Sequence, residues 1–397
     1  MENPYANARI VGVHTTKQAR SLAPRSSFSV ALEALRGALD DAGMSWDDLD
    51  GFGSFGTDWP RNDAEWAFQL DRQWKWSGRG VDADALMEAC AQVSRGRLNA
   101  VALVTAGVRP AERTVAPWVD HGSQWTAWAG SLPDQPVQFG LVARRYLHTV
   151  GPKALDAMGE VAASTRNFGS INPDAVFFGR GPYTAEDVLN SRPIADPLTL
   201  LMCSVVSDGG AAIIIAHKDR AGATGKRGVS LVCGDSLVHY GVYHQPPVLD
   251  GYYEMSQRYR DTMKRAGITR DDIDCVEFYD HFASHYLLQY ETFGFCGKGE
   301  GADLALAGEM RLTGRWPTCT DGGNLSFTHP GFPVVFRYIE AVRQLRGEVK
   351  DLCPEWERGE HTYDPAICRK VRGADTALVS SYGTPTVQGS FVVLAGD

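Results

Sequence analysis

The sequence lacks long apolar runs, paired cysteines and an excess of basic residues, and each absence excludes a class of protein. The apolar run Ala211–Ala216 is long enough only for a buried strand, because a membrane span needs about 20 residues. Eight cysteines without a CxxC pair indicate reduced thiols in a cytoplasmic protein rather than a disulfide framework. A net charge of -9 without a basic stripe argues against nucleic-acid binding. The first residues also lack the basic-then-apolar order of a signal peptide.

Hydrophobic residues are plentiful, and tryptophan is concentrated in one segment. With 44% hydrophobic residues over 397 positions, the chain can bury a large core in two domains or one layered domain. Seven of its ten tryptophans lie between Trp59 and Trp128, in a segment too polar to be all core. Trp74 and Trp76 are two residues apart, so an extended segment would place them on one face. The segment predicts either a flat apolar pocket for a polycyclic acyl group or an interface with a partner.

An internal repeat organises the chain. Residues Ala42–Phe55 (AGMSWDDLDGFGSF) match Ala266–Tyr279 (AGITRDDIDCVEFY) at a constant offset. Each copy follows an amphipathic helix, expected at Ser29–Asp41 and Gln257–Arg265. Each then shows a helix-ending Gly, a capping Ser or Thr, two acids and an apolar strand. Two copies so far apart predict duplicated halves of one α/β architecture.

The repeat predicts an N-terminal half at residues 1–222 and a C-terminal half at 226–397. The polar stretch His217–Gly228 is the expected linker between them. Between about residues 110 and 200, prolines, tryptophans and helices interrupt the alternation of strands and helices. We expect an insertion carried by the first half, and insertions of this size commonly carry a binding site.

Four local sequences then resemble the thiolase superfamily, in order along nearly the whole chain. Asp321–Glu348 resembles the thiolase GHP loop and the helix after it, and Glu277–Gly301 resembles a second active-site loop in its sterol-carrier-protein-X version. Pro193–Ile215 resembles the segment that closes the first half, and Ser380–Ser390 stands where thiolases carry a C-terminal Cys-Gly loop. The resemblance implies a thiolase fold: duplicated α/β halves forming a five-layered αβαβα core with a loop-domain insertion.

The chain departs from the thiolase pattern at both cysteines. Thiolases place a nucleophilic Cys at the N-terminus of a buried helix, where the helix dipole favours the thiolate. The corresponding helix, Asp82–Arg95, has no Cys at its start, and Cys90 in its middle is expected to be a small buried hydrophobe. The second thiolase Cys is replaced by Tyr382. A Claisen condensation would therefore lack its nucleophile and its usual acid.

The residues that remain suit the enolate of a CoA thioester. His329 matches the thiolase His that donates a hydrogen bond to the thioester oxygen, and such a bond matters most as negative charge develops. Tyr279 stands at the Asn or His position of the neighbouring loop, with Asp280 at its acid. Gly383 follows Tyr382, so its backbone N–H is placed to line an anion hole.

The resemblance is strongest to thiolase-like retro-aldolases of steroid side-chain degradation, of the lipid-transfer-protein type. It implies a carbon–carbon lyase that cleaves a 3-hydroxyacyl-CoA with a tertiary hydroxyl to a ring ketone and propionyl-CoA. Tyr382, His329 and Tyr279 would be catalytic, with Asp280 and Gly383 in support. The resemblance also implies a homodimer and a small OB-fold partner with a zinc ribbon. CoA enters only as part of the substrate, and no tightly bound cofactor is expected.

Several residues have a second interpretation. Tyr279 fits a packing role almost as well, and Asp280 is also placed to cap a helix expected at His281–Tyr290. His281 and His285 are four residues apart, a spacing that can present two imidazoles to a metal. No third ligand is evident in the sequence, so we predict no metal site.

Two other functions stay open at this point. One is a thiolase-like acyltransferase or synthase that uses a cysteine elsewhere in the chain. The other is a non-catalytic thiolase-fold subunit that shapes a complex. Labelling of one cysteine with loss of activity would favour the first, and a complex that tolerates changes at both Tyr382 and His329 would favour the second.

Overall fold

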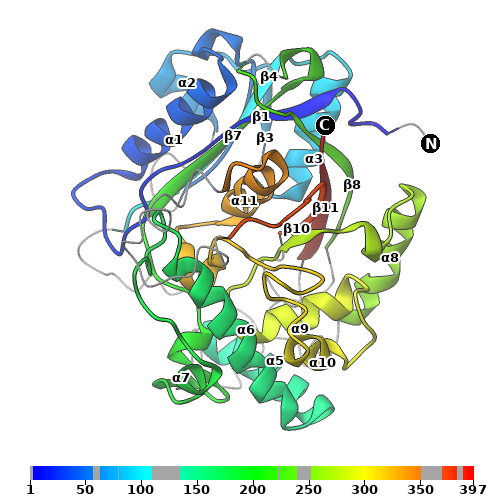
Figure 1. Ribbon diagram of the computed structural model, residues 1–397. Helices are drawn as coiled ribbons and strands as arrows, with labels where there is room; N and C mark the ends of the chain where they lie inside the picture. Colours follow the sequence, from blue (N-terminus) through cyan, green and yellow to red (C-terminus); the bar gives the residue numbers. More distant parts are fainter. Residues whose placement is uncertain are drawn as a thin grey trace, which may run out of the picture.

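The computed structural model shows a layered α/β protein built around one mixed sheet (Figure 1). The residues that it describes are 3–56, 63–78, 80–109, 135–221, 224–238, 252–349, 369–381 and 388–397. Among these residues, the sheet has nine strands in the order β3-β2-β4-β7-β1-β8-β11-β10-β9.

Two sets of strands repeat one pairing pattern within this sheet. The first set is β1 (Ala8–Thr15), β2 (Gly51–Gly56), β3 (Trp76–Gly78), β4 (Ala100–Gly107) and β7 (Gly209–His217). The second set is β8 (Val229–Val238), β9 (Cys275–Glu277), β10 (Thr376–Ser380) and β11 (Gln388–Gly396). In the first set β1, β7 and β4 pair antiparallel in turn, and β4 pairs parallel with β2. The second set repeats this with β8, β11, β10 and β9. The pair Ile10–Val229 joins β1 to β8.

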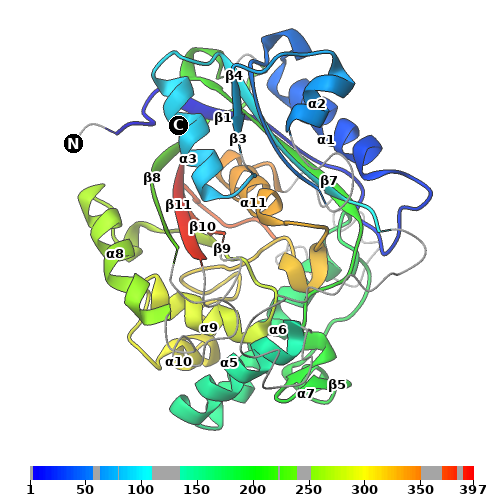
Figure 2. The same ribbon diagram turned by 180° about the vertical axis from the view of Figure 1, so that it is seen from behind.

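The two sets of strands form two layers of the protein, and helices form the other three (Figures 1 and 2). The helices that flank the strands are α1 (Ser27–Ala42), α2 (Asp63–Leu70), α3 (Ala83–Ser94), α8 (Tyr252–Arg265) and α11 (Val334–Arg346). Helix α1 packs on the outer face of the first set, and α8 packs on β8 in the second. Helices α3 and α11 lie between the two sets and contact strands of both. The predicted five-layered core is therefore confirmed.

The predicted sequence repeat is visible as a repeated structure. Helices α1 and α8 each precede a glycine with positive φ, 62° at Gly43 and 75° at Gly267. A short 3-10 turn follows in each copy, with a capping box between Ser45 and Asp48 in the first and a Thr269–Asp272 box in the second. Strands β2 and β9 come next. The limits of the halves stay a prediction, because residues 222 and 223 lie outside the described part.

Two further groups of elements pack together at one end of the molecule (Figure 1). Between β4 and β7 the chain forms α5 (Gln135–Val150), α6 (Lys153–Ser170), α7 (Ala185–Leu189), β5 (Pro193–Ala195) and β6 (Leu198–Thr199). Between β9 and α11 it forms α9 (Ala283–Thr292) and α10 (Gly301–Leu306). Helix α6 contacts both α9 and α10, and their apolar side chains share one core. The loops after β9 and before α11 contribute Tyr279 and Leu325 to the same core.

The described tryptophans of the Trp-rich segment pack into the protein. Trp66 is 1% exposed and packs against Phe28 and Phe52, with ring centroids 5.0 and 4.9 Å apart. The prediction that Trp74 and Trp76 share a face is wrong. Trp74 stacks on Phe52 on the α1 side of the sheet, whereas Trp76 packs against the α3 side, because β3 begins only at Trp76. The remaining tryptophans of this segment, Trp59, Trp118, Trp125 and Trp128, lie outside the described residues.

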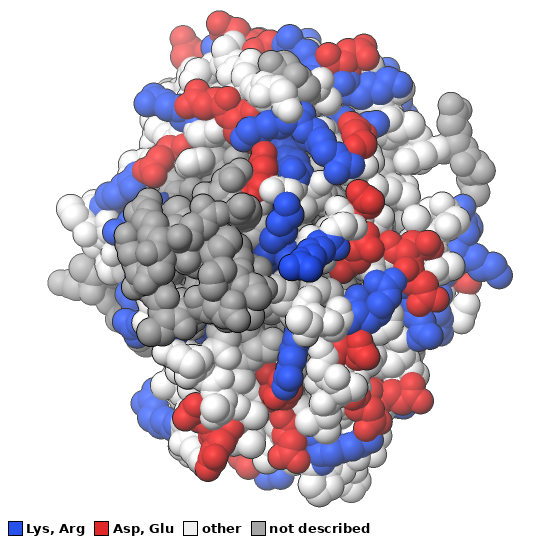
Figure 3. All heavy atoms as spheres, in the orientation of Figure 1, with Lys and Arg blue, Asp and Glu red and all other residues white. Residues whose placement is uncertain are grey.

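The charged surface mixes both signs. Figure 3 shows acidic and basic side chains interspersed over the face that it presents. Of the helices in the described ranges, none combines the length and the apolar character that crossing a bilayer requires.

Candidate active site

Two loops and one extended segment meet near the ends of β9 and β10. They are residues 278–282 after β9, residues 319–333 before α11, and residues 203–208 before β7. The backbone N–H groups of Ser204 and Val205 donate to a carbonyl in each of the two loops, at 2.9 and 2.8 Å. The central segment thereby holds the two loops side by side.

Tyr279 and His329 face each other across this junction. The Tyr279 hydroxyl lies 3.5 Å from His329 Nε2, with the two rings inclined at 71°. Tyr279 is 6% exposed, and His329 is half-buried. A contact of this length is at the limit of a hydrogen bond, and catalytic contacts commonly tighten when substrate binds. The structure thus brings together two of the three residues predicted to be catalytic.

His329 is oriented through its backbone and through its neighbour. Its N–H donates to Ser207 Oγ at 2.7 Å, and Ser207 Oγ lies 3.0 Å from the hydroxyl of Thr328. The Thr328 hydroxyl in turn donates to Gln18 Oε1 at 2.7 Å. Desolvation lowers the pKa of His329 to about 4, helped by the positive charges of nearby arginines. The imidazole is therefore neutral near neutral pH and able to accept a proton.

His281 is a further candidate for the active site. From the sequence we considered it only as a possible metal ligand. It is 3% exposed, its ring lies 4.9 Å from the Tyr279 ring, and it packs edge-on against Phe139 at 4.3 Å. Neither ring nitrogen has a hydrogen-bond partner in the described part of the chain. Burial, with the neighbouring His285 and His329, holds its pKa well below the usual value. A buried imidazole without a partner at either nitrogen, beside Tyr279 and His329, suits a polar group of a substrate or an ordered water.

The His281–His285 spacing does not assemble a metal site among the described residues. The two rings lie 4.3 Å apart and tilted by 36°, and Phe139 packs against both. Across the described ranges no group of three or more His, Cys, Asp or Glu side chains is placed to hold an ion. His281 lies just before α9 and His285 lies on it, and both imidazoles face an aromatic environment.

Asp280 connects the two site loops. Its fully buried carboxylate accepts the Tyr286 hydroxyl at 2.6 Å and the backbone N–H of Asn324 at 2.8 and 2.9 Å. The prediction that it caps the helix after it is wrong, because α9 begins at Ala283 with Phe282 at its N-cap. Asp280 instead caps the short turn 323–327 that leads to His329. Desolvation raises its pKa, and these donors oppose the rise.

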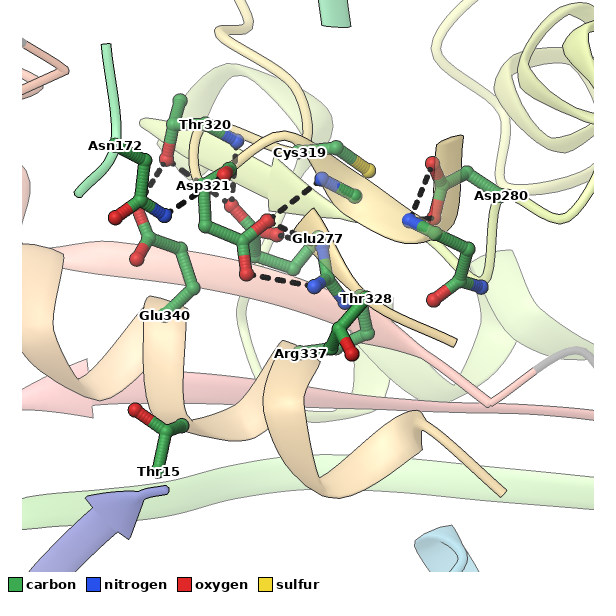
Figure 4. Close-up of polar contacts among 12 residues, drawn as sticks. Thr15, Asn172, Glu277, Asp280, Cys319, Thr320, Asp321, Thr328, Arg337 and Glu340 are labelled. Carbon is green, nitrogen blue, oxygen red and sulfur yellow. Dashed lines mark hydrogen bonds and ion pairs between the residues drawn. The ribbon is translucent and has the colours of Figure 1, made fainter. Parts of the chain in front are cut away.

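A buried cluster of charges lies beneath the loops (Figure 4). Arg337 on α11 makes two 2.6 Å contacts with Asp321 and one 3.3 Å contact with Glu277. Next to them, Arg369 pairs with Glu340. All five residues are at most 2% exposed, and desolvation raises the pKa of both Glu277 and Asp321. Neither arginine stands in a motif that marks it as functional in the sequence.

An aromatic row leads from the surface to the site. Phe55 at the end of β2 is 39% exposed and packs against Phe332, with ring centroids 5.3 Å apart. Phe332 lies 5.9 Å from the Tyr279 ring. The rings are tilted by 48° and 36° to one another, and the row gives the site an apolar aromatic wall.

Comparison with known proteins identifies the family. The 17-hydroxy-3-oxo-4-pregnene-20-carboxyl-CoA lyase of Mycobacterium tuberculosis is 32% identical over 366 residues, which are 86% of this chain and 92% of that protein. The chain belongs to the thiolase superfamily. The steroid side-chain-cleaving aldolase of Thermomonospora curvata is 31% identical over 86% of this chain and 90% of its own length.

Solved structures and a family model agree with the assignment to the thiolase superfamily. The solved structure of an Ltp2-ChsH2(DUF35) aldolase has a TM-score of 0.82 and 26% identity, with 100% of this chain and 99% of that chain covered. Human mitochondrial 3-ketoacyl-CoA thiolase shares the fold, with a TM-score of 0.64. The model "Thiolase C-terminal domain-like" matches residues 239–358.

The start of α3 lacks the thiolase nucleophile. Asp82 is the N-cap of α3, and its side chain accepts the N–H of Ala85 at 3.1 Å. Cys90 lies mid-helix, 1% exposed, and burial raises its pKa to about 12. Burial also raises the pKa of four other described cysteines: Cys233, Cys275, Cys296 and Cys319. These thiols are poor candidates for an acyl-carrying nucleophile.

Tyr382 and Gly383 lie outside the described residues. The two serines before them are placed at the site. Ser380 Oγ accepts the backbone N–H of Tyr279 at 3.0 Å, and Ser381 Oγ accepts that of Ala83 at 3.3 Å. The chain that leads to Tyr382 therefore connects the Tyr279 loop with the start of α3.

Proposed function

We propose that this protein is a carbon–carbon lyase that performs a retro-aldol cleavage of a 3-hydroxyacyl-CoA. The observation that carries the proposal is the Tyr279–His329 pair in a thiolase fold whose α3 begins without a cysteine. A site that can stabilise an enolate but has no nucleophilic thiol suits cleavage of a carbon–carbon bond without transfer of an acyl group to the enzyme. The two relatives, a CoA lyase and a side-chain-cleaving aldolase, support the same reaction.

The reaction needs one proton removed from a hydroxyl and one delivered to a carbon. Tyr279 accepts the proton of the β-hydroxyl as its own phenolic proton passes to His329 Nε2. The Cα–Cβ bond then breaks, the β-carbon becomes a ketone, and its electrons form the thioester enolate. The imidazolium at His329 stabilises the enolate oxygen at the moment its charge develops. A free tyrosine titrates near 10, whereas the pKa of His329 is lowered to about 4. The imidazole therefore holds the phenolic proton only while a negative charge, first on the enolate and then on Tyr382, stabilises the imidazolium.

Tyr382 completes the cycle by protonating Cα of the enolate. In thiolases the second cysteine stands at this position, and Gly383 follows it with an N–H for the oxyanion. The proton held by His329 restores Tyr382 after the ketone leaves. The proton taken from the β-hydroxyl is matched by the proton delivered to Cα, and the reaction needs no oxidant, metal or bound cofactor.

The substrate that fits best is a steroid side-chain CoA ester with a tertiary β-hydroxyl, cleaved to a ring ketone and propionyl-CoA. The row Phe55–Phe332–Tyr279 supports a flat polycyclic group, because aromatic faces stack on rigid apolar rings. The name of the M. tuberculosis lyase describes a 17-hydroxy steroid carrying a carboxyl-CoA side chain, which supports a substrate of the same class.

We further propose a cytoplasmic homodimer that works with a small OB-fold protein carrying a zinc ribbon. The similar solved aldolase is paired with a DUF35 protein, which supports a partner of this kind.

The deciding experiment incubates the pure chain, with and without the OB-fold partner, with a 17-hydroxy steroid CoA ester of this type. Mass spectrometry is expected to detect the ring ketone and propionyl-CoA in equal amounts. The 17-deoxy ester is the control and should stay intact, because it has no hydroxyl to deprotonate. Thiolysis of a 3-oxoacyl-CoA in place of this cleavage would reject the proposal in favour of an acyltransferase.

A further inference from the structure

One buried guanidinium contacts both the end of β9, just before the Tyr279 loop, and the loop that carries His329. Arg337 is 0% exposed and lies on the central helix α11. It contacts Glu277, two residues before Tyr279, and holds Asp321 at the start of the loop that ends in His329 (Figure 4).

We propose that Arg337 is a positioning residue that sets the separation between the Tyr279 hydroxyl and His329 Nε2. The inference rests on the proposed function for its kinetic consequence, and on the structure alone for its geometric one. Arg337 touches neither reacting group. It acts through Glu277 on one side and through Asp321 on the other.

The Asp321 side of this link is stiff. Both Asp321 oxygens receive a guanidinium N–H at 2.6 Å, and Oδ1 also accepts the N–H of Gly323 at 2.8 Å. Gly322 and Gly323 then turn the chain with φ of 106° and 56°. A Cβ on Gly323 would lie 2.0 Å from the Asp280 carboxylate, so the turn packs directly against the other site loop. A shift at Asp321 is therefore passed along the turn to His329.

The Glu277 side is equally constrained. Glu277 ends β9, where Val276 pairs with Leu378 of β10, and its Oε1 accepts the N–H and the hydroxyl of Thr320 at 3.2 Å each. Two residues later the Tyr279 N–H donates to Ser380 Oγ. A planar guanidinium can bridge the two carboxylates in fixed geometry, which the single ammonium of lysine cannot reproduce.

The chain offers a matched control. Arg369 is 1% exposed, pairs with the buried Glu340 at 2.5 Å and donates to the Thr320 carbonyl at 3.0 Å. Arg337→Lys and Arg369→Lys therefore make the same chemical change in the same buried cluster. They differ in that only Arg337 bridges the carboxylates of Glu277 and Asp321.

The kinetic test compares the two variants on the 17-hydroxy steroid CoA ester. We expect Arg337→Lys to lower kcat by about 100-fold with little change in KM, because displacing reacting groups by about 1 Å has an effect of that size. Arg369→Lys should lose comparable stability in urea but keep most of its kcat. If Arg337→Lys does not fold, Asp321→Asn keeps the side-chain shape, weakens the same link and should show the same kcat loss. Equal kcat losses in the Arg337 and Arg369 variants would overturn the proposal.

A double mutant separates positioning from general damage. In a His329→Ala background, Arg337→Lys should lower the residual kcat far less than in the wild type, since the group that it positions is gone. Additive losses would overturn the proposal.

A measurement without turnover keeps this inference distinct from the proposed function. In imidazole NMR spectra of the full chain, Arg337→Lys should move the His329 resonances and Arg369→Lys should leave them in place. If the wild type shows no aldolase activity but this pattern appears, the positioning role stands and the reaction is wrong. Unmoved His329 resonances in Arg337→Lys would reject the positioning role whatever the reaction.

Discussion

The buried imidazole of His285 makes the stability of the protein depend on pH in a way that can be calculated. The side chain is 0% exposed, and burial lowers its pKa from 6.5 to about 3. Between these two values the unfolded chain binds a proton that the folded chain does not, so stability falls as the pH falls through this range. Each unit below 6.5 costs about 1.4 kcal/mol, which gives about 2 kcal/mol at about pH 5 and almost nothing at about pH 7.5.

The assay is urea unfolding of the wild type and of His285→Gln, which cannot titrate. Any cost of the substitution at neutral pH cancels, because each protein is compared with itself at the two pH values. Other titrating groups also cancel as far as the substitution leaves them unchanged. The stability difference between wild type and variant should therefore move by about 2 kcal/mol in the variant's favour on going to about pH 5. A difference that is the same at both pH values would show that His285 does not resist protonation.

Three further predictions concern the site directly. Tyr382→Phe should fold like the wild type but lose turnover, and an active Tyr382→Phe enzyme would remove this tyrosine from the mechanism. The acid limb of kcat/KM that belongs to His329 should lie near its pKa of about 4, so a limb near 6.5 would show that the imidazole is solvated. Gly323→Ala should destabilise the fold by about 1–3 kcal/mol, measured in urea, because a positive φ and the nearby Asp280 carboxylate both oppose a Cβ. A neutral Gly323→Ala would mean that the turn relaxes freely.

Local patterns made the repeat predictable, and the resemblance to thiolase loops made the meeting of Tyr279 with His329 predictable. The capping residues Ser45 and Thr269 stand at the same place in two copies, and the structure forms the same box at each. Tyr279 and His329 were identified by the loops in which they stand, and the structure places their side chains in contact. Spacing within each copy reveals the repeat, whereas the two loops are recognised by their resemblance to thiolase loops, so neither prediction needs knowledge of distant contacts.

Contacts between distant segments could not be predicted in the same way. Arg337 lies in a run of aromatic and charged residues that resembles a half-exposed helix, and its partners are 16 and 60 residues away. Asp280 was expected to cap the helix that follows it. Its carboxylate instead accepts a backbone N–H from the turn before His329, and α9 begins without it. The prediction that Trp74 and Trp76 share a face is wrong because the extended strand β3 begins only at Trp76.

The position of α3 and α11 between the two sets of strands has a consequence for how the protein unfolds. Each half of the chain supplies one of these helices, and each helix buries its side chains against strands from both halves. Neither half can therefore complete its core alone. The duplicated halves should unfold as one cooperative unit. The two loops that carry Tyr279 and His329 extend from strands and a helix that are stable only while both halves are assembled. Local unfolding in either half should therefore disturb the candidate site.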